Sequence, residues 1–147
     1  MFKAIYKNFI ISIFVLLVLS VSAFGQSPVK WKLESEAKGK QLKKDEKFTA
    51  KLSAEIEDRW YLYSPDQPAG GPVATSIKIP EDKQFEIKGD VKFPKPETKF
   101  DENFKIETRF FKKSVEFEIP LKTTNNLNAD DLQINVRYQV CDDKICL

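Results

Sequence analysis

Residues 48–56 read FTAKLSAEI, and this stretch decides the fold class. Apolar residues occupy every second position from Phe48 to Ile56, with mainly polar residues between them. Successive side chains of a β-strand point to opposite faces, so this period predicts a strand with one apolar and one polar face. Such a strand needs a second apolar layer to cover its inner face. The stretch therefore predicts a layered β-structure.

Three further runs of the sequence alternate in the same way. Their apolar positions are Val29, Trp31 and Leu33; Val115, Phe117, Ile119 and Leu121; and Leu132, Ile134, Val136, Tyr138 and Val140. Turn-forming sequences separate the runs, among them PDQPAGGP at 65–72 and TTNNLNADD at 123–131. No segment after the N-terminus shows a long amphipathic helical pattern. We expect about seven to nine short strands in two antiparallel sheets, an immunoglobulin-like β-sandwich.

The first 25 residues have the layout of a secretory signal peptide. Two lysines precede an apolar run from Phe9 to Val21, and small residues follow up to Gly25. This run is shorter than the ~20 apolar residues that a membrane-spanning helix needs. We expect residues 1–25 to be a cleaved signal peptide and residues 26–147 to form one exported domain, with an uncleaved anchor as the alternative. In an oxidising compartment outside the cytoplasm a disulfide can persist.

Charge and composition exclude several classes of function. Two of the 24 basic residues and none of the 22 acidic residues fall in 1–25, so residues 26–147 carry 22 of each sign. This balance argues against a nucleic-acid or anionic-membrane surface. The chain contains no histidine, which excludes Ser-His-Asp and Cys-His catalysis. Two cysteines among scattered carboxylates do not make a zinc site, so we expect no metal and no cofactor.

The reactive groups that remain are Cys141 and Cys146, in the sequence CDDKIC. They form either a structural staple or a redox pair. In the chain-entropy model, a disulfide that closes about six residues stabilises the fold by roughly 2 kcal/mol, against roughly 4 kcal/mol for a loop of about 50. A domain of about 120 residues does not need such a weak brace, which favours the redox interpretation. Asp142 and Asp143 disfavour a thiolate beside them, so a partner would have to supply the attacking thiolate.

Three motifs of the sequence point to a known family. They are YQVCDDKICL at 138–147, WYLYSPDQPAGGPVAT at 60–75, and PKP followed by FDENF at 94–104. Together they resemble the N-terminal periplasmic domain of the thiol:disulfide interchange protein DsbD, from Val29 to Leu147 and in the family's order. The resemblance implies an immunoglobulin-like sandwich that is the electron-delivering domain of a periplasmic protein-disulfide reductase, rather than a complete enzyme. It implies a membrane-embedded relay of the DsbD type as electron source and thioredoxin-like periplasmic proteins as partners.

The resemblance also implies which residues form the site. The family has a redox pair, two aromatic residues that line the site, and a cap loop with a covering ring beside two carboxylates. The matching residues are Cys141 and Cys146; Tyr61 and Tyr63; and Phe104 with Asp101 and Glu102. Phe100 is the alternative covering ring, and ordinary packing is the alternative role for each of the aromatic residues. The resemblance further implies that Cys146 forms the mixed disulfide with a partner and that Cys141 resolves it.

The sequence departs from the family after the second cysteine. There the family continues with prolines, a further strand and a multi-helix membrane domain, whereas this sequence ends at Leu147. We therefore expect a truncated domain, or a stand-alone version that takes electrons from a separate protein. The alternative function is a secreted immunoglobulin-like binding module in which the disulfide only braces a loop.

Overall fold

The computed structural model of the protein describes residues 27–102 and 104–147, so the predicted signal peptide lies outside the described residues. This part of the chain contains twelve β-strands and one 3-10 helix, η1. The strands are β1 Val29–Ser35, β2 Gln41–Leu42, β3 Lys47–Ile56, β4 Tyr61–Tyr63, β5 Ser76–Lys78, β6 Phe85–Ile87, β7 Glu97–Asp101, β8 Ile106–Phe111, β9 Ser114–Thr123, β10 Leu127–Asn128, β11 Asn135–Arg137 and β12 Val140–Cys141, and η1 is Ala129–Asp131. Over the same residues, no helix is long and apolar enough to span a membrane.

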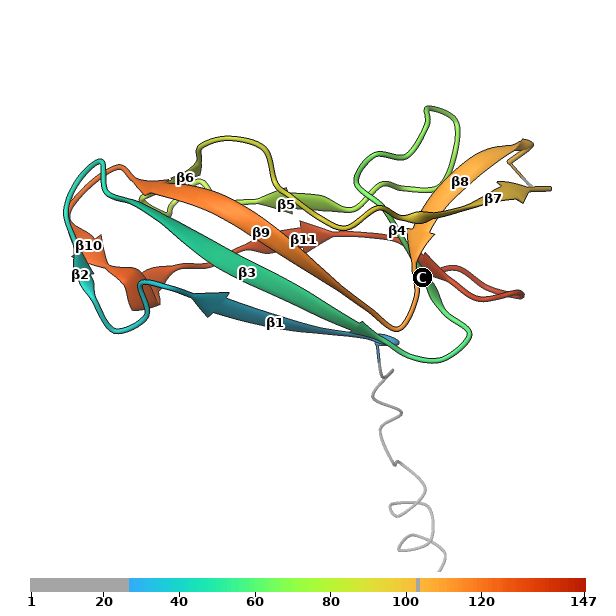
Figure 1. Ribbon diagram of the computed structural model, residues 1–147, viewed down its shortest axis with the longest axis horizontal. Coiled ribbons are helices and arrows are strands. Elements are labelled where there is room, and N and C mark those ends of the chain that lie inside the picture. Colours follow the sequence, from blue (N-terminus) through green and yellow to red (C-terminus); the bar gives the residue numbers. More distant parts are fainter. Residues whose placement is uncertain (1–26, 103) are drawn as a thin grey trace, which may run out of the picture.

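The strands form two four-stranded antiparallel sheets and two short pairs. The order is β1-β3-β9-β6 in the first sheet and β12-β4-β8-β7 in the second, while β2 pairs with β10 and β5 with β11. In Figure 1, β1, β3 and β9 run side by side along the molecule, and β4, β7 and β8 lie at one end of it. This arrangement confirms the predicted all-β fold and its immunoglobulin-like sandwich architecture.

The main core forms on the inner faces of β3 and β9 because both strands alternate as predicted. Leu52 lies opposite Phe117 in the register, and the small side chains of Ala50 and Ala54 flank it along β3. Phe117 is 0 % exposed. Its ring centroid lies 5.9 Å from that of Phe111 on β8, so aromatic packing connects the two sheets.

The twelve strands exceed the predicted seven to nine, because several strands of two or three residues lie outside the predicted runs and one predicted run is interrupted. The interrupted run extends from Leu132 to Val140, and its alternation predicts one strand. The structure divides it between β11, which pairs with β5, and β12, which pairs with β4. The alternating burial persists across the break, since each apolar residue of the run is buried or half-buried. The pattern thus predicts which side chains face inward but not that the chain changes its pairing partner.

Candidate functional site

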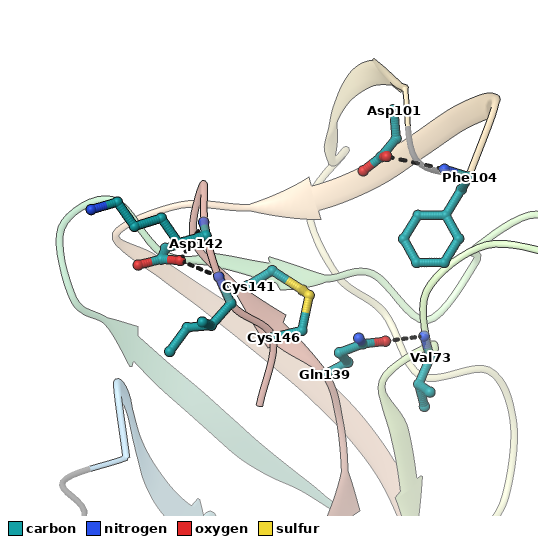
Figure 2. Close-up of a disulfide and its surroundings, with 9 residues drawn as sticks. Val73, Asp101, Phe104, Gln139, Cys141, Asp142 and Cys146 are labelled. Atoms are coloured by element: carbon teal, nitrogen blue, oxygen red, sulfur yellow. Dashed lines mark hydrogen bonds between the residues drawn. A yellow bond between two sulfur atoms is a disulfide. The ribbon is translucent and has the colours of Figure 1, made fainter.

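A disulfide between Cys141 and Cys146 closes a short hairpin at the end of β12. Val140 and Leu147 exchange two backbone hydrogen bonds of 3.0 and 2.8 Å, and the two cysteines face each other one position further along. Their Cα atoms are 4.1 Å apart. Opposed residues without mutual hydrogen bonds lie about 4.5 Å apart in antiparallel pairs, so the disulfide joins a cross-strand pair of this kind. Figure 2 shows the disulfide beside the turn that carries Asp142.

The two cysteines differ in exposure. Cys141 is 3 % exposed, because its side chain packs in a cluster with those of Tyr63 and Phe110. Cys146 is exposed on the far side of the turn, where it forms an isolated β-bridge with Cys141. A thiolate from another protein can therefore reach the sulfur of Cys146 more easily than that of Cys141.

Cys141 belongs to a small aromatic cluster on the outer face of the second sheet. The cluster contains Tyr63 and Phe110, each 5 % exposed, with Tyr61 packed against them. Tyr61 lies directly opposite Cys141 in the register, and its ring centroid is 5.1 Å from that of Phe110. Tyr61 and Tyr63 share this face, as their spacing predicts. Outer faces of sandwiches are usually polar, so an aromatic cluster there marks a specialised surface.

A groove of ≈ 220 Å³ lies beside this cluster, between the β7–β8 hairpin and the C-terminal hairpin. It is lined by Tyr61, Tyr63, Lys99, Phe100, Asp101, Glu102, Thr108, Phe110, Asp142 and Asp143. Four of the predicted site residues, namely the two tyrosines and the two carboxylates, are thereby brought together. Burial raises the pKa of Tyr63, and the nearby negative charge of Asp101 raises that pKa further.

The β7–β8 hairpin carries both candidate covering rings, Phe100 on β7 and Phe104 between the two strands. Phe100 is 53 % exposed and lines the groove, whereas Phe104 is half-buried and is not among the groove residues. The Phe104 backbone N–H donates to Asp101 Oδ1 over 3.2 Å, which holds Phe104 over the end of the hairpin. In Figure 2 the Phe104 ring hangs from this connection toward the side on which the disulfide lies. That Phe104 forms a lid over the disulfide stays a prediction, whereas Phe100 is an exposed part of the groove lining.

The Phe104→Ala variant tests the predicted lid by removing its ring. The disulfide should then be reduced several-fold faster by glutathione, because a small thiol would meet less obstruction on its way to Cys146. The rate is measured with excess reduced glutathione, by trapping free thiols with an alkylating reagent. A matched Phe100→Ala variant should react at nearly the wild-type rate. A higher rate for Phe100→Ala alone would assign the lid to Phe100, and a lower melting temperature for Phe104→Ala would indicate a packing role instead.

The loop of residues 64–75 is fixed to elements that neighbour the site, an arrangement that the sequence analysis did not predict. Its first half is fixed to β8: the Gln67 side chain accepts from Arg109 N over 3.1 Å and donates to Arg109 O, and Arg109 Nη1 donates to Asp66 Oδ2 over 2.9 Å. Its second half is fixed near β12, where Val73 N donates to Gln139 Oε1 over 2.6 Å (Figure 2). Polar side chains thus substitute for backbone pairing along this loop.

Two features of the sequence could have revealed the aromatic cluster on the outer face and the lysine side chain that covers it. RFF at 109–111 places phenylalanines on both faces of one strand, so the outer face of that strand also had to be covered. Lys112 follows, and its Nζ lies 5.1 Å from the Tyr61 ring centroid and 5.2 Å from that of Phe110. This cation–π contact covers the cluster with the stem of a charged side chain.

The chemistry open to this site is that of sulfur. Among the described residues, no group of three or more histidine, cysteine, aspartate or glutamate side chains is placed to hold a metal ion. A disulfide between one buried and one exposed cysteine, set at the tip of an immunoglobulin-like sandwich, defines a class of thiol–disulfide modules that do not use the thioredoxin fold.

The chain belongs to the family described as "Thiol:disulfide interchange protein DsbD, N-terminal", which its residues 30–147 match. The crystal structure of the N-terminal periplasmic domain of ScsB from Proteus mirabilis has a similar fold, with a TM-score of 0.59 and 18% sequence identity. The similarity covers 86% of this chain and 45% of that one, so the chain spans about half the length of the ScsB chain. Comparison with curated proteins gave no match.

Proposed function

We propose that the protein passes electrons between other proteins through the Cys141–Cys146 dithiol/disulfide. The observation that carries this proposal is the disulfide between an exposed cysteine and a buried one in a family of thiol:disulfide interchange domains. The exposed Cys146 would receive the attack, and the buried Cys141 would be the group displaced. The groove, the cap connection and the 64–75 loop would together form the surface against which a partner rests.

The exchange consists of two thiolate displacements. A partner thiolate attacks the sulfur of Cys146, the Cys141–Cys146 bond breaks, and Cys141 leaves as a thiolate that takes up a proton. A second partner thiolate then attacks the partner sulfur of the mixed disulfide and releases Cys146. Two electrons and two protons have then moved from the partner dithiol to the protein, and the partner has become a disulfide. The reverse sequence reduces a downstream partner.

The expected partners follow from this role. A DsbD-type membrane relay would supply the electrons, and thioredoxin-like periplasmic proteins would exchange with the domain. Residues 1–25 would direct export as a signal peptide, and residues 26–147 would act in the periplasm. The protein would then be the electron-delivering domain of a protein-disulfide reductase and not a complete enzyme. The matched ScsB structure is itself described as a periplasmic domain, which supports this location.

The disulfide is expected to be reducible without loss of the fold. Opening it should cost the folded state no more than about 2 kcal/mol, because it closes only a six-residue loop, and the main core lies on the other face of the second sheet. Circular dichroism of the reduced protein should retain the β-sheet spectrum, and equilibration with glutathione should give a potential above about −300 mV.

Two results would contradict this function and favour the alternative, a secreted binding module with a purely structural disulfide. One is loss of the β-sheet spectrum on reduction, and the other is a potential well below about −300 mV. A Cys141→Ser/Cys146→Ser double variant is the matched control. It should fold but transfer no electrons from a reduced thioredoxin-like protein to an oxidised one.

A further inference from the structure

The turn between the two cysteines is held by one side chain, that of Asp142. Asp142 Oδ1 accepts hydrogen bonds from the backbone N–H groups of Lys144 and Ile145, each over 2.8 Å. Asp142 N in turn donates to Ile145 O over 2.9 Å. We propose that Asp142 is a positioning residue of the redox pair, which keeps Cys146 opposite Cys141 while the disulfide is open. This inference rests on the proposed exchange function.

The backbone of this turn explains why a side chain is needed. Only Asp143 and Lys144 lie at its tip, and two-residue hairpin loops favour type I′ turns, in which both tip residues have positive φ. Neither Asp143 nor Lys144 has a positive φ. In a regular hairpin the N–H of Ile145 would donate to the backbone oxygen of Asp142, but here it donates to the side chain. The Asp142 carboxylate therefore accepts the hydrogen bond that the backbone oxygen of Asp142 would accept in a regular hairpin, and it closes the turn in this way.

The hydrogen bonds and the disulfide stabilise each other. In the oxidised protein the covalent bond already holds the two strands together, so the Asp142 hydrogen bonds form with little further loss of freedom. In the dithiol, those hydrogen bonds and the Val140–Leu147 pair are what hold the hairpin closed. Coupling of this kind is reciprocal, so the side chain that the disulfide helps to order must also favour the disulfide.

The Asp142 hydrogen bonds also affect the step in which Cys141 resolves the mixed disulfide between Cys146 and a partner. Here the Cys141 thiolate attacks Cys146 Sγ of a mixed disulfide, the new Cys141–Cys146 bond forms, and the partner sulfur leaves as a thiolate. The rate depends on how often the two cysteines are within reach, and an ordered turn raises their effective concentration. Asp142 also carries a negative charge, since the N–H groups of Ile145 and Lys144 hold its pKa below the usual value. That charge disfavours a neighbouring thiolate, so positioning and charge act in opposite directions on the rate.

Substitutions at Asp142 separate the two effects. Asp142→Asn keeps the Oδ1 acceptor and removes the charge, Asp142→Glu keeps the charge and displaces the acceptor, and Asp142→Ala removes both. The equilibrium constant with glutathione is measured by alkylation and mass spectrometry. Asp142→Ala and Asp142→Glu are expected to shift it about tenfold toward the dithiol, which corresponds to ~30 mV. Asp142→Asn should remain within about twofold of the wild-type constant, because its hydrogen bonds are retained.

Asp143→Ala is the matched control for charge. It removes the adjacent carboxylate, which takes part in neither turn hydrogen bond. Its equilibrium constant should also stay near the wild-type value, while the pH dependence of alkylation should show lower thiol pKa values in both Asp143→Ala and Asp142→Asn. Equal constants for Asp142→Ala, Asp142→Asn and the wild type would overturn the positioning role. So would an Asp142→Asn constant that matches Asp142→Ala, since only charge would then matter.

A failure of the positioning role can be distinguished from a failure of the proposed function. Electron transfer from a reduced thioredoxin-like protein is measured on the wild type in parallel. Should the wild type not exchange, the function fails whatever the variants do. Should it exchange while the Asp142 variants show no difference in their glutathione equilibrium, only the positioning role fails. Circular dichroism of each variant verifies that the sandwich is intact, and Asp142→Glu provides the test if Asp142→Ala does not fold.

Discussion

A Cys141→Ala variant is expected to form a covalent complex with a thioredoxin-like partner, and a Cys146→Ala variant is expected to form almost none. The reason is access. Cys146 is exposed on the far side of the turn, whereas Cys141 is 3 % exposed and packs in the cluster with Tyr63 and Phe110. The rate of mixed-disulfide formation should differ between the two variants by a factor on the order of 100, because thiol–disulfide exchange follows access as well as thiolate character.

The measurement uses a single-cysteine form of the partner whose thiol has been activated with thionitrobenzoate. Release of the coloured leaving group gives the rate, and non-reducing electrophoresis identifies the complex. Both variants are also measured in concentrated urea, where burial is lost and the two rates should converge. A complex formed readily by Cys146→Ala but not by Cys141→Ala would reverse the proposed roles of the two cysteines.

The Phe117→Ala variant is expected to lose about 3–5 kcal/mol of unfolding free energy, as large aromatic truncations in a packed core do. Phe117 is 0 % exposed, and its ring centroid lies within 6.2 Å of those of Trp31, Phe93 and Phe111. No small movement of neighbouring side chains can refill a space that two sheets share. Urea unfolding followed by tryptophan fluorescence measures the loss.

Leu33→Ala is the matched control for this truncation. Leu33 lies on the edge strand β1 and is 36 % exposed, so its truncation should cost less than about 1 kcal/mol. A similar loss in the two variants would mean that the core does not depend on the Phe117 contacts. The expected loss at Phe117 also exceeds the roughly 2 kcal/mol attributed to the disulfide, which is why the fold should survive reduction.

The period-two pattern predicted the sheets well where a strand is long and alternates throughout. In β3 and β9 one face of the strand is buried, and shifting either strand by one residue would bring its apolar side chains to the surface. The pattern did not predict where the chain changes the strand with which it pairs, as it does between β11 and β12. Burial continues across that break, so the sequence carries no sign of it.

The candidate site was only partly predictable from the sequence. The motifs were sufficient to single out the tyrosines and the cap carboxylates, and the structure brings these around one groove. Gln67 and Gln139 were not predicted, because a glutamine that substitutes for backbone pairing is indistinguishable in sequence from a solvated one. The role of Asp142 in the turn was missed for a related reason: a carboxylate between two cysteines first suggests its charge, and only the conformation reveals its hydrogen bonds.

Adjacent residues of the second sheet point to opposite faces, so the sheet separates the side chains of the main core from those of the outer cluster. Leu62, Phe111 and Val140 face the main core, while their immediate neighbours Tyr61, Phe110 and Cys141 face the outer cluster. Effects of substitutions usually add when the sites share no contacts. Variation on the outer side could therefore adjust partner choice and redox behaviour over evolution with little penalty to folding, and an engineer could transplant the hairpin and its aromatic surround onto another sandwich by changing alternate residues of three strands.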